Sequence, residues 1–228
     1  MSGFVPGLAS LEAALGAVAE AALGGPPARV LDLGGGPGLL AERLAARWPR
    51  ARVGLLDLDP VLLALAEAGT TDRIAVYAGD LAGPAWPEAV AQNAPVDLVT
   101  VMMTMHYLTP DRAAALYGDV RSIMRPGGLL IVADLMPDPG IPAVMSVSCP
   151  VADEAAAGLA WARWWDEIKA DPSLEPRIRE RRAVFGDRSA AEFTPDAGWH
   201  RDAARAAGFR EAGVVWRWGP YAAVGAVA

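Results

Sequence analysis

Apolar and polar positions alternate between two spacings along the first 135 residues of the chain. Short, nearly continuous apolar runs are typical of strands buried in a parallel sheet, whereas apolar residues recurring every three or four positions are typical of amphipathic helices. The runs predict strands at 28–33, 51–58, 73–80, 96–104 and 127–135, the last after the turn sequence RPGG. The helical spacing predicts helices at 10–23, 38–47, 60–68, 86–92 and 109–124, of which 86–92 has the weakest pattern.

Turn and capping residues mark several of these boundaries. The sequence GGPP at 24–27 ends the first helix, while Pro60 and Pro110 suit the first turn of their helices and Thr109 suits an N-cap. Strands that alternate with helices in this way predict an α/β fold, a doubly wound parallel sheet with helices on both faces. In such a sheet, ligands bind at the carboxyl ends of the strands.

The alternation stops between Met136 and about Arg201. This stretch holds four tryptophans, several prolines and the mixed-charge sequence KADPSLEPRIRERR, and we interpret it as a helical insertion or lid. A helix and a terminal hairpin of two strands are predicted after it, at 200–209, 211–218 and 220–227. The chain is therefore interpreted as one domain with four parts: an N-terminal helix (1–27), a ligand-binding core (28–135), the lid (136–201) and a C-terminal helix with strands (202–228).

The sequence VLDLGGGPGLL places four glycines within five positions, directly after a predicted strand. A glycine-rich turn between a strand and a helix brings bare backbone close to a ligand and directs N–H groups toward it. A dinucleotide fingerprint that starts at Gly34 and Gly36 would need a third glycine where the chain has Leu39. The spacing is instead Gly34, Gly36 and Gly38, with Asp32 before it.

Two carboxylates follow the next two predicted strands. Asp57 ends the second strand, where an acid accepts hydrogen bonds from ribose hydroxyls, and Asp80 ends the third, where an acid accepts from an exocyclic adenine amine. Each aspartate alone would as readily cap a helix. Together with the glycines, they favour a site for a ligand that contains a nucleoside.

These motifs resemble those of the class I S-adenosylmethionine-dependent methyltransferases. The resemblance covers about residues 28–135, with a weaker similarity at AAGFREAGVVWRW. It implies a Rossmann-like seven-stranded sheet of order 3-2-1-4-5-7-6 in which strand 7 is antiparallel. It also implies S-adenosyl-L-methionine as the cofactor and methyl transfer as the reaction.

The resemblance implies a role for each matching position. In this family the D-x-G-x-G-x-G motif surrounds the methionine part of the cofactor, the acids after strands two and three hold ribose and adenine, and the end of strand four lines the sulfonium side. The matching residues are Asp32, Gly34, Gly35, Gly36 and Gly38 for the motif, Asp57 and Leu58 for ribose, Asp80 and Leu81 for adenine, and Met102 and Met103 for the sulfonium side. Asp59 is a second acid two positions after Asp57, so the ribose contact is either Asp57 or Asp59.

His106 follows the fourth predicted strand, which puts it at the mouth of the expected site. A neutral imidazole there can remove a proton from a substrate O–H or N–H, and a half-buried histidine bonded to backbone is the equally weighted alternative. Tyr107 closes over the cofactor or packs, and Asp134 bonds a substrate or caps the next segment. His200 is expected to be a solvated residue at a helix terminus. No cluster of histidine and acids has metal-ligand spacing, so no metal is predicted.

Trp161, Trp164 and Trp165 occupy one face of a predicted helix in the lid. Such a stripe is more often core than recognition surface, but the segment would cover a substrate, so Trp161 and Trp165 are candidate substrate contacts. Arginines interleaved with acids follow, a pattern typical of a solvated face that also suits a clamp for an acidic substrate. They are Arg177, Arg179, Arg181 and Arg182, with Glu175 and Glu180.

The composition limits which binding partners and which cellular compartment are expected for the protein. The chain has 228 residues, 53% of them hydrophobic, and 20 basic against 27 acidic residues give a net charge of −7. This balance argues against nucleic acid or an anionic membrane as a partner. The single cysteine, Cys149, fits a reducing cytoplasm. The N-terminal segment lacks the basic residues of a secretory signal, and no apolar run is long enough to span a membrane, so a cytoplasmic protein is expected.

The expected reaction is methyl transfer to a small-molecule acceptor, mainly by positioning and exclusion of water, with His106 as an optional base. Three alternatives stay open: an NAD-dependent oxidoreductase, which Leu39 disfavours; a non-catalytic cofactor-binding scaffold; and a tRNA-modifying methyltransferase, which the net charge disfavours. The acceptor atom (O, N, C or S) is not determined by the sequence. The apolar N-terminal helix either covers the site or pairs with a second subunit, which leaves a homodimer open.

Overall fold

The computed structural model describes residues 7–69, 71, 73–148, 151–186 and 188–228, so Cys149 lies outside the described residues. Seven strands form one sheet in the order β3-β2-β1-β4-β5-β7-β6. They are β1 (Arg29–Leu33), β2 (Arg52–Asp57), β3 (Ile74–Ala78), β4 (Val96–Met102), β5 (Met124–Leu135), β6 (Glu211–Trp218) and β7 (Tyr221–Val227). The first five strands pair in parallel, and β7 runs antiparallel to both β5 and β6. The expected fold class and strand order are therefore confirmed.

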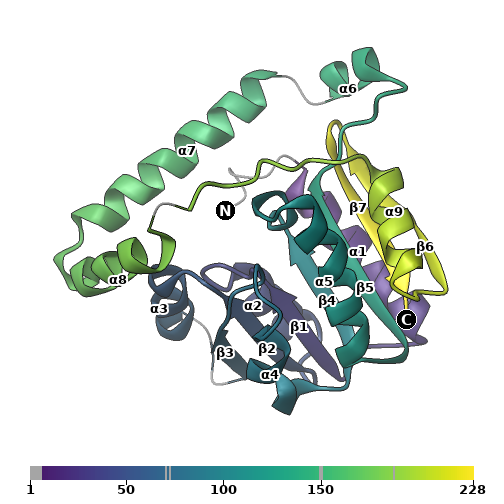
Figure 1. Cartoon of the computed structure of the whole chain (residues 1–228), viewed down its shortest axis with the longest axis horizontal. Coiled ribbons are helices and arrows are strands. Elements are labelled where there is room, and N and C mark those ends of the chain that lie inside the picture. The colour runs from purple at the N-terminus through teal and green to yellow at the C-terminus, as the bar shows by residue number, and fades with distance from the viewer. Residues whose placement is uncertain (1–6, 70, 72, 149–150, 187) are drawn as a thin grey trace.

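Helices cover both faces of the sheet (Figure 1). The helices are α1 (Leu8–Leu23), α2 (Leu39–Arg47), α3 (Pro60–Gly69), α4 (Trp86–Ala89), α5 (Pro110–Ile123), α6 (Pro142–Ser148), α7 (Val151–Ala170), α8 (Glu175–Phe185) and α9 (Ala197–Ala206). Leu31 and Leu33 of β1 belong to the core beneath α4, α5 and α9, whereas Val30 belongs to the core beneath α1, α2 and α3. Burial on both faces explains why the strands are nearly continuous apolar runs.

The N-terminal helix packs against β5 and β6. Leu11, Leu15 and Ala19 of α1 are buried in the same core as α2. The apolar face of α1 is therefore covered within this chain.

Two elements begin three residues earlier than predicted. β5 begins at Met124, three residues earlier than expected, and the RPGG sequence lies inside the strand, where the register against β4 shifts. α9 begins at Ala197 because the side chain of Asp196 caps it, accepting a hydrogen bond from the Trp199 amide at 2.9 Å. Local spacing misses both features because the strand irregularity and the cap do not alter the apolar pattern.

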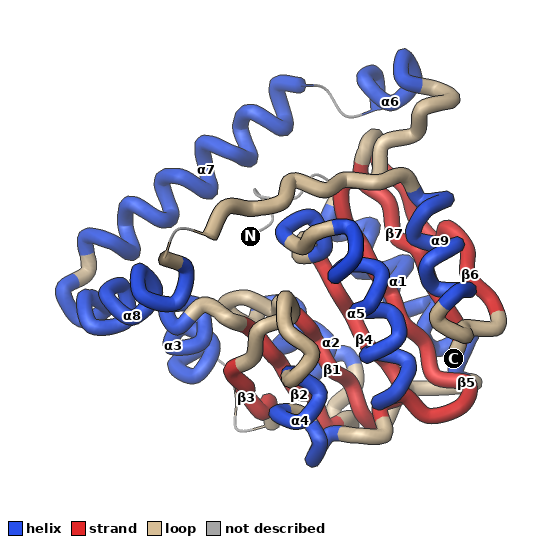
Figure 2. Tube along the Cα trace, in the orientation of Figure 1, coloured by secondary structure: helices blue, strands red, loops and turns tan. Residues whose placement is uncertain are grey.

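The expected helical insertion is present as α6, α7 and α8. α8 packs on α3 through a small core that contains Val61, Ile168 and Ile178, while α6 and α7 stand away from the sheet (Figure 1). Residues 188–196, here named the strap, return without regular structure to α9 and cross the edge where the parallel strands end (Figure 2). Within the described residues, no helix combines the length and apolar character that a membrane crossing requires.

Candidate cofactor and acceptor site

The glycine-rich sequence forms a tight loop between β1 and α2. Gly34, Gly36 and Gly38 have φ of +67°, +56° and +88°, in the left-handed region that only glycine adopts without strain. The amides of Gly34 and Gly35 donate to the Leu56 carbonyl at 2.7 and 3.2 Å. These bonds hold the loop against the carboxyl end of β2.

Asp57 faces this loop. Its Oδ2 accepts from the Gly36 amide at 2.8 Å, and its Oδ1 accepts from the Asp59 amide at 2.9 Å. Burial raises the pKa of Asp57, and the backbone hydrogen bonds oppose that rise. Asp59 instead turns toward α3, where its Oδ1 accepts from the Val61 amide at 2.9 Å. Of the two candidate ribose acids, the structure thus brings Asp57 against the glycines.

Asp80 lies two residues beyond β3, on the edge that Asp57 shares. Its Oδ1 accepts from the Ala82 amide at 2.9 Å, and its Oδ2 accepts from Arg188 Nη1 at 2.7 Å. Leu81 is buried in the core, and Leu58 is half-buried. The two strand-end acids and the glycine loop therefore occupy one edge of the sheet, as the sequence predicts.

Asp32 lies beneath the loop and is almost fully buried. Its Oδ1 accepts from the Thr100 hydroxyl at 2.7 Å, while its Oδ2 has no partner among the described residues. Burial raises the pKa of Asp32 to about 7, the Thr100 hydrogen bond lowers it, and the charge of Asp57 raises it. One carboxylate oxygen is thus available to a further donor.

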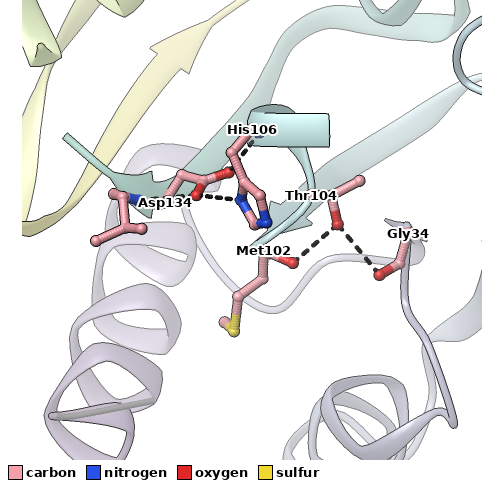
Figure 3. Close-up of polar contacts among 6 residues, drawn as sticks. Gly34, Met102, Thr104, His106 and Asp134 are labelled. Carbon is pink, nitrogen blue, oxygen red and sulfur yellow. Dashed lines mark hydrogen bonds and ion pairs between the residues drawn. The ribbon is translucent and has the colours of Figure 1, made fainter. Parts of the chain in front are cut away.

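The end of β4 contacts the glycine loop through Thr104 (Figure 3). The Thr104 hydroxyl lies 2.9 Å from the Met102 carbonyl and 3.3 Å from the Gly34 carbonyl. A Cβ at Gly34 would lie 2.3 Å from that hydroxyl oxygen, so glycine is required there. Met103 has φ of +51°, a strained value for methionine. Backbone from β1 and β4 is therefore in close contact at this point.

His106 and Asp134 form a hydrogen-bonded pair beside this contact. His106 Nδ1 lies 2.7 Å from Asp134 Oδ1, and the His106 amide donates to Asp134 Oδ2 at 3.2 Å. The Asp134 side chain is 2% exposed and that of His106 is 17% exposed. A buried carboxylate at Nδ1 holds the proton on that nitrogen and leaves Nε2 as the acceptor. Figure 3 shows the second ring nitrogen pointing away from Asp134. The sequence predicts that Asp134 bonds a substrate or caps the next segment, and in the structure its carboxylate is hydrogen-bonded to His106.

Tyr107 lies at the entrance to this pair. Its ring centroid is 4.1 Å from that of His106, and the residue is 55% exposed. Partial burial raises the pKa of Tyr107, as do the charges of Asp134 and Asp57, while Arg181 lowers it. Tyr107 is thus close to the histidine pair, the ribose candidate and the lid.

Comparison with known proteins points to one kind of enzyme. Residues 30–128 match the family model of a methyltransferase domain. A trans-aconitate 2-methyltransferase of Streptomyces avermitilis is 37% identical over 89 residues, which are 36% of this chain and 30% of that protein. A tRNA1(Val) (adenine(37)-N6)-methyltransferase of Porphyromonas gingivalis is 40% identical over 67 residues, 27% of this chain and 26% of that protein. A malonyl-[acyl-carrier protein] O-methyltransferase of Laribacter hongkongensis is 34% identical over 118 residues, 49% and 39% of the two chains.

Residues 30–128 are a class I, S-adenosylmethionine-dependent methyltransferase domain.

Solved structures extend the similarity of fold beyond this domain. A putative O-methyltransferase of Nostoc punctiforme superposes with a TM-score of 0.60 at 16% identity, over 95% of this chain and 56% of that one. Human N-acetylserotonin methyltransferase in complex with S-adenosylmethionine gives 0.58 at 16% identity, over 95% and 51%. The matches cover less than two fifths of the first three relatives and just over half of these structures.

The loop of the methyltransferase domain suits a cofactor of this kind. A Cβ at Gly36 would meet nothing nearer than Leu62 at 3.9 Å, so the space above that glycine is open. Asp57 and Asp80 lie on the same edge of the sheet, and the unpartnered Oδ2 of Asp32 lies 2.7 Å from where a Cβ at Gly35 would be. Bare backbone and carboxylate acceptors are groups that suit an adenosyl amino acid.

Outside the methyltransferase domain, the lid tryptophans form a cluster. The Trp161 and Trp164 rings stack with centroids 5.0 Å apart, and Trp165 meets both edge-on. Trp164 and Trp165 pack on the small core between α3, α7 and α8. A cavity of about 390 Å³ lies between α7 and α8, with Trp165 and Arg181 in its lining. The cluster thus combines packing with a half-buried aromatic surface.

His200 is not solvated, contrary to the sequence prediction. It is 1% exposed, and its Nδ1 lies 2.8 Å from the Tyr117 hydroxyl. Burial lowers the pKa of His200 to about 4, and the charges of Asp134 and Asp196 raise it. The prediction failed because the packing of α9 on α5 brings this residue inside the molecule.

Three contributors to the site were missed from the sequence: Thr104, Arg188 and the ion-pairing role of Arg181. Thr104 carries no motif, and its importance comes from the approach of Gly34. The arginines follow a pattern typical of solvated faces, and in the described part of the lid Arg181 and Arg188 pair with Asp59 and Asp80.

Proposed function

We propose that the protein transfers the methyl group of S-adenosyl-L-methionine to a hydroxyl group of a small-molecule acceptor. The observation that carries the proposal is the His106–Asp134 pair, which lies beside the glycine loop and the end of β4. A buried carboxylate that fixes a histidine tautomer is the arrangement of a general base. A hydroxyl acceptor needs such a base, because its proton must leave as the new bond forms.

The proposed cofactor contacts follow from the edge of the sheet. The open backbone around Gly36 would hold the amino-acid part, together with the free oxygen of Asp32. Asp57 and Leu58 would hold the ribose, Asp80 and Leu81 the adenine, and Met102 would line the sulfonium side. When bound, the cofactor supplies an electrophilic methyl group on sulfur.

In this proposal His106 acts on the acceptor. Its Nδ1–H donates to Asp134, which leaves Nε2 as the acceptor. Nε2 would then take the proton of the acceptor hydroxyl as the oxygen of that hydroxyl bonds to the methyl group. The Asp134 side chain would stabilise the imidazolium that results. Its hydrogen bonds from the amides of His106 and Leu135 hold the carboxylate in place.

The acceptor would lie beneath the lid. Tyr107, Trp161 and Trp165 are the proposed substrate contacts, because Tyr107 packs on His106 and the two tryptophans offer partly exposed aromatic surface. In one domain, residues 28–135 would form the cofactor-binding core and residues 136–201 the substrate lid. Exclusion of water by the lid would strengthen the electrostatic role of Asp134.

We also propose the class of acceptor, the compartment and the oligomeric state of the enzyme. The net charge of −7 supports a small molecule over a nucleic acid as the acceptor, although one similar protein is a tRNA methyltransferase. The single cysteine supports a cytoplasmic location. A homodimer stays a prediction, which sedimentation velocity checks.

Calorimetry and turnover test the proposal together. S-adenosylhomocysteine, the product of methyl transfer, is expected to bind in the low micromolar range or tighter, and NADH is expected not to bind. A panel of hydroxyl, amine, thiol and carboxylate acceptors is then assayed for S-adenosylhomocysteine release, with wild type and His106→Asn compared. Hydroxyl acceptors that turn over only with His106 support the proposal. Failure of both S-adenosylmethionine and S-adenosylhomocysteine to bind, or turnover that ignores His106, would refute it.

A further inference from the structure

Two arginines connect the lid to the cofactor edge of the sheet. Arg181, on α8, forms an ion pair with Asp59, and Arg188, at the start of the strap, forms one with Asp80 at 2.7 Å. Asp59 follows β2 and Asp80 follows β3, the strands that carry the proposed nucleoside contacts. One short stretch of the lid is therefore attached to this edge at two points, which we name the latch.

Arg181 is packed as well as paired. Its guanidinium lies 4.5 Å from the ring centroid of Trp165 and 4.6 Å from that of Phe185. The Asp59 side chain is 4% exposed with Arg181 in place, so the two charges form a largely buried ion pair. Arg177 gives a contrast, because it pairs with Glu180 on its own helix and both side chains are about half exposed. Arg181 is thus the arginine of α8 that resists separation from the core.

A chain of hydrogen bonds leads from Arg181 to the glycine loop. Arg181 Nε donates to Asp59 Oδ2, and the Asp59 amide donates to Asp57 Oδ1 at 2.9 Å. The Gly36 amide donates to the other oxygen of Asp57 at 2.8 Å. A ligand that fixes Asp57 and Gly36 therefore also fixes the acid that Arg181 holds.

The strap adds a second path to the acceptor side. Its Phe193 amide donates to the His106 carbonyl at 3.1 Å. Arg188 starts this segment, and Asp196 ends it as the cap of α9. Movement of the strap away from Asp80 would therefore disturb the backbone that carries His106.

We propose that Arg181 and Arg188 are positioning residues that couple closure of the lid to occupation of the glycine loop. A ligand at the loop stabilises the latched lid, and the latched lid tightens the binding of that ligand. The two effects are equal in free energy, because coupling between sites is reciprocal. The inference rests on the proposed cofactor site and is independent of the acceptor and of methyl transfer.

Hydrogen–deuterium exchange on the full chain tests the coupling, with and without S-adenosylhomocysteine. Wild type, Arg181→Ala, Arg188→Ala and the matched control Arg177→Ala are compared, with β4 as the internal reference. In wild type and in the control, the ligand slows exchange in both the glycine loop and α8. In Arg181→Ala, α8 exchanges about tenfold faster without ligand, and the ligand protects the glycine loop alone. Release of S-adenosylhomocysteine is also about tenfold faster in Arg181→Ala and Arg188→Ala than in the control.

Three results would overturn the inference. Equal exchange of α8 in Arg181→Ala and Arg177→Ala rejects the latch, and ligand protection of α8 that survives Arg181→Ala rejects the coupling. If Arg181→Ala also loosens β4, Arg188→Ala decides, because its half-exposed side chain is removed at little risk to the fold, and unchanged ligand release then rejects the inference. If wild type does not bind S-adenosylhomocysteine at all, the proposed function and the coupling both fall, and the ligand-free exchange still shows whether the latch exists.

Discussion

A single added methyl group at Gly36 should separate cofactor binding from folding. Gly36 has φ of +56° and Gly24, at the end of α1, has φ of +72°. A Cβ at Gly24 meets nothing within 4 Å, and one at Gly36 meets only Leu62 at 3.9 Å. Gly36→Ala and Gly24→Ala therefore impose the same backbone strain in equally open space, and they differ in where the methyl group lies.

The stability change should be small and alike in both variants. Left-handed backbone costs a non-glycine residue about 1–2 kcal/mol, and the loss of glycine's freedom in the unfolded chain offsets about 0.4–1 kcal/mol. Each substitution should thus lower the free energy of unfolding by about 1 kcal/mol, a shift in Tm of about 2–4 °C for a chain of this size. At Gly36 the methyl group also enters the space proposed for the cofactor. Overpacking of about 2 kcal/mol there weakens binding about 30-fold.

Thermal unfolding and calorimetry with S-adenosylhomocysteine measure the two quantities on the same samples. We expect matched Tm values for Gly36→Ala and Gly24→Ala, a raised Kd for Gly36→Ala, and the wild-type Kd for Gly24→Ala. A wild-type Kd for Gly36→Ala would show that no ligand approaches the loop there. Equal weakening in both variants would mean that the effect comes from folding.

Three further outcomes follow from the buried polar groups. Asp134→Asn should leave S-adenosylhomocysteine binding intact and lower turnover of a hydroxyl acceptor by about 100- to 10,000-fold, because an amide does not hold the required tautomer of His106; steady-state kinetics with unchanged turnover would contradict this. Burial lowers the pKa of His200 from 6.5 to about 4, so the unfolded state binds more protons in that window and stability is lost as pH falls through it. Urea unfolding across this range should show the loss, and His200→Phe should reduce it. The contribution of Asp32 to stability depends on pH in the opposite direction. Because burial raises its pKa from 3.8 to about 7, the contribution is present below pH 3.8 and is lost as pH rises through about 7. Asp32→Asn should therefore make the ligand-free protein relatively more stable above pH 7 in thermal unfolding, and a uniform loss of stability at all pH values would argue against this account.

Local pattern alone located most elements of this protein. The strands β1 to β4 and helices α2, α3 and α5 lie within a few residues of their predicted ranges, because burial on both faces of a parallel sheet leaves an unmistakable apolar run. The glycine loop and Asp57 and Asp80 were also placed correctly on one edge. Parallel strands bring their carboxyl ends together, so the position of a residue along its own strand is enough.

The pairings within the site were decided by tertiary structure. Asp134 holds His106 across 28 positions, and Arg181 reaches Asp59 across 122. His200 carries no sequence mark of burial and becomes an interior residue only when α9 packs on α5. The apolar periodicity indicates which side of an element is buried, but it does not identify the distant side chains that this side contacts. The sequence by itself therefore determined the sheet, the loop and the edge of the sheet that carries the candidate site. The orientation of His106 and the attachment of α8 and the strap depend on contacts that exist only once separate segments have packed together.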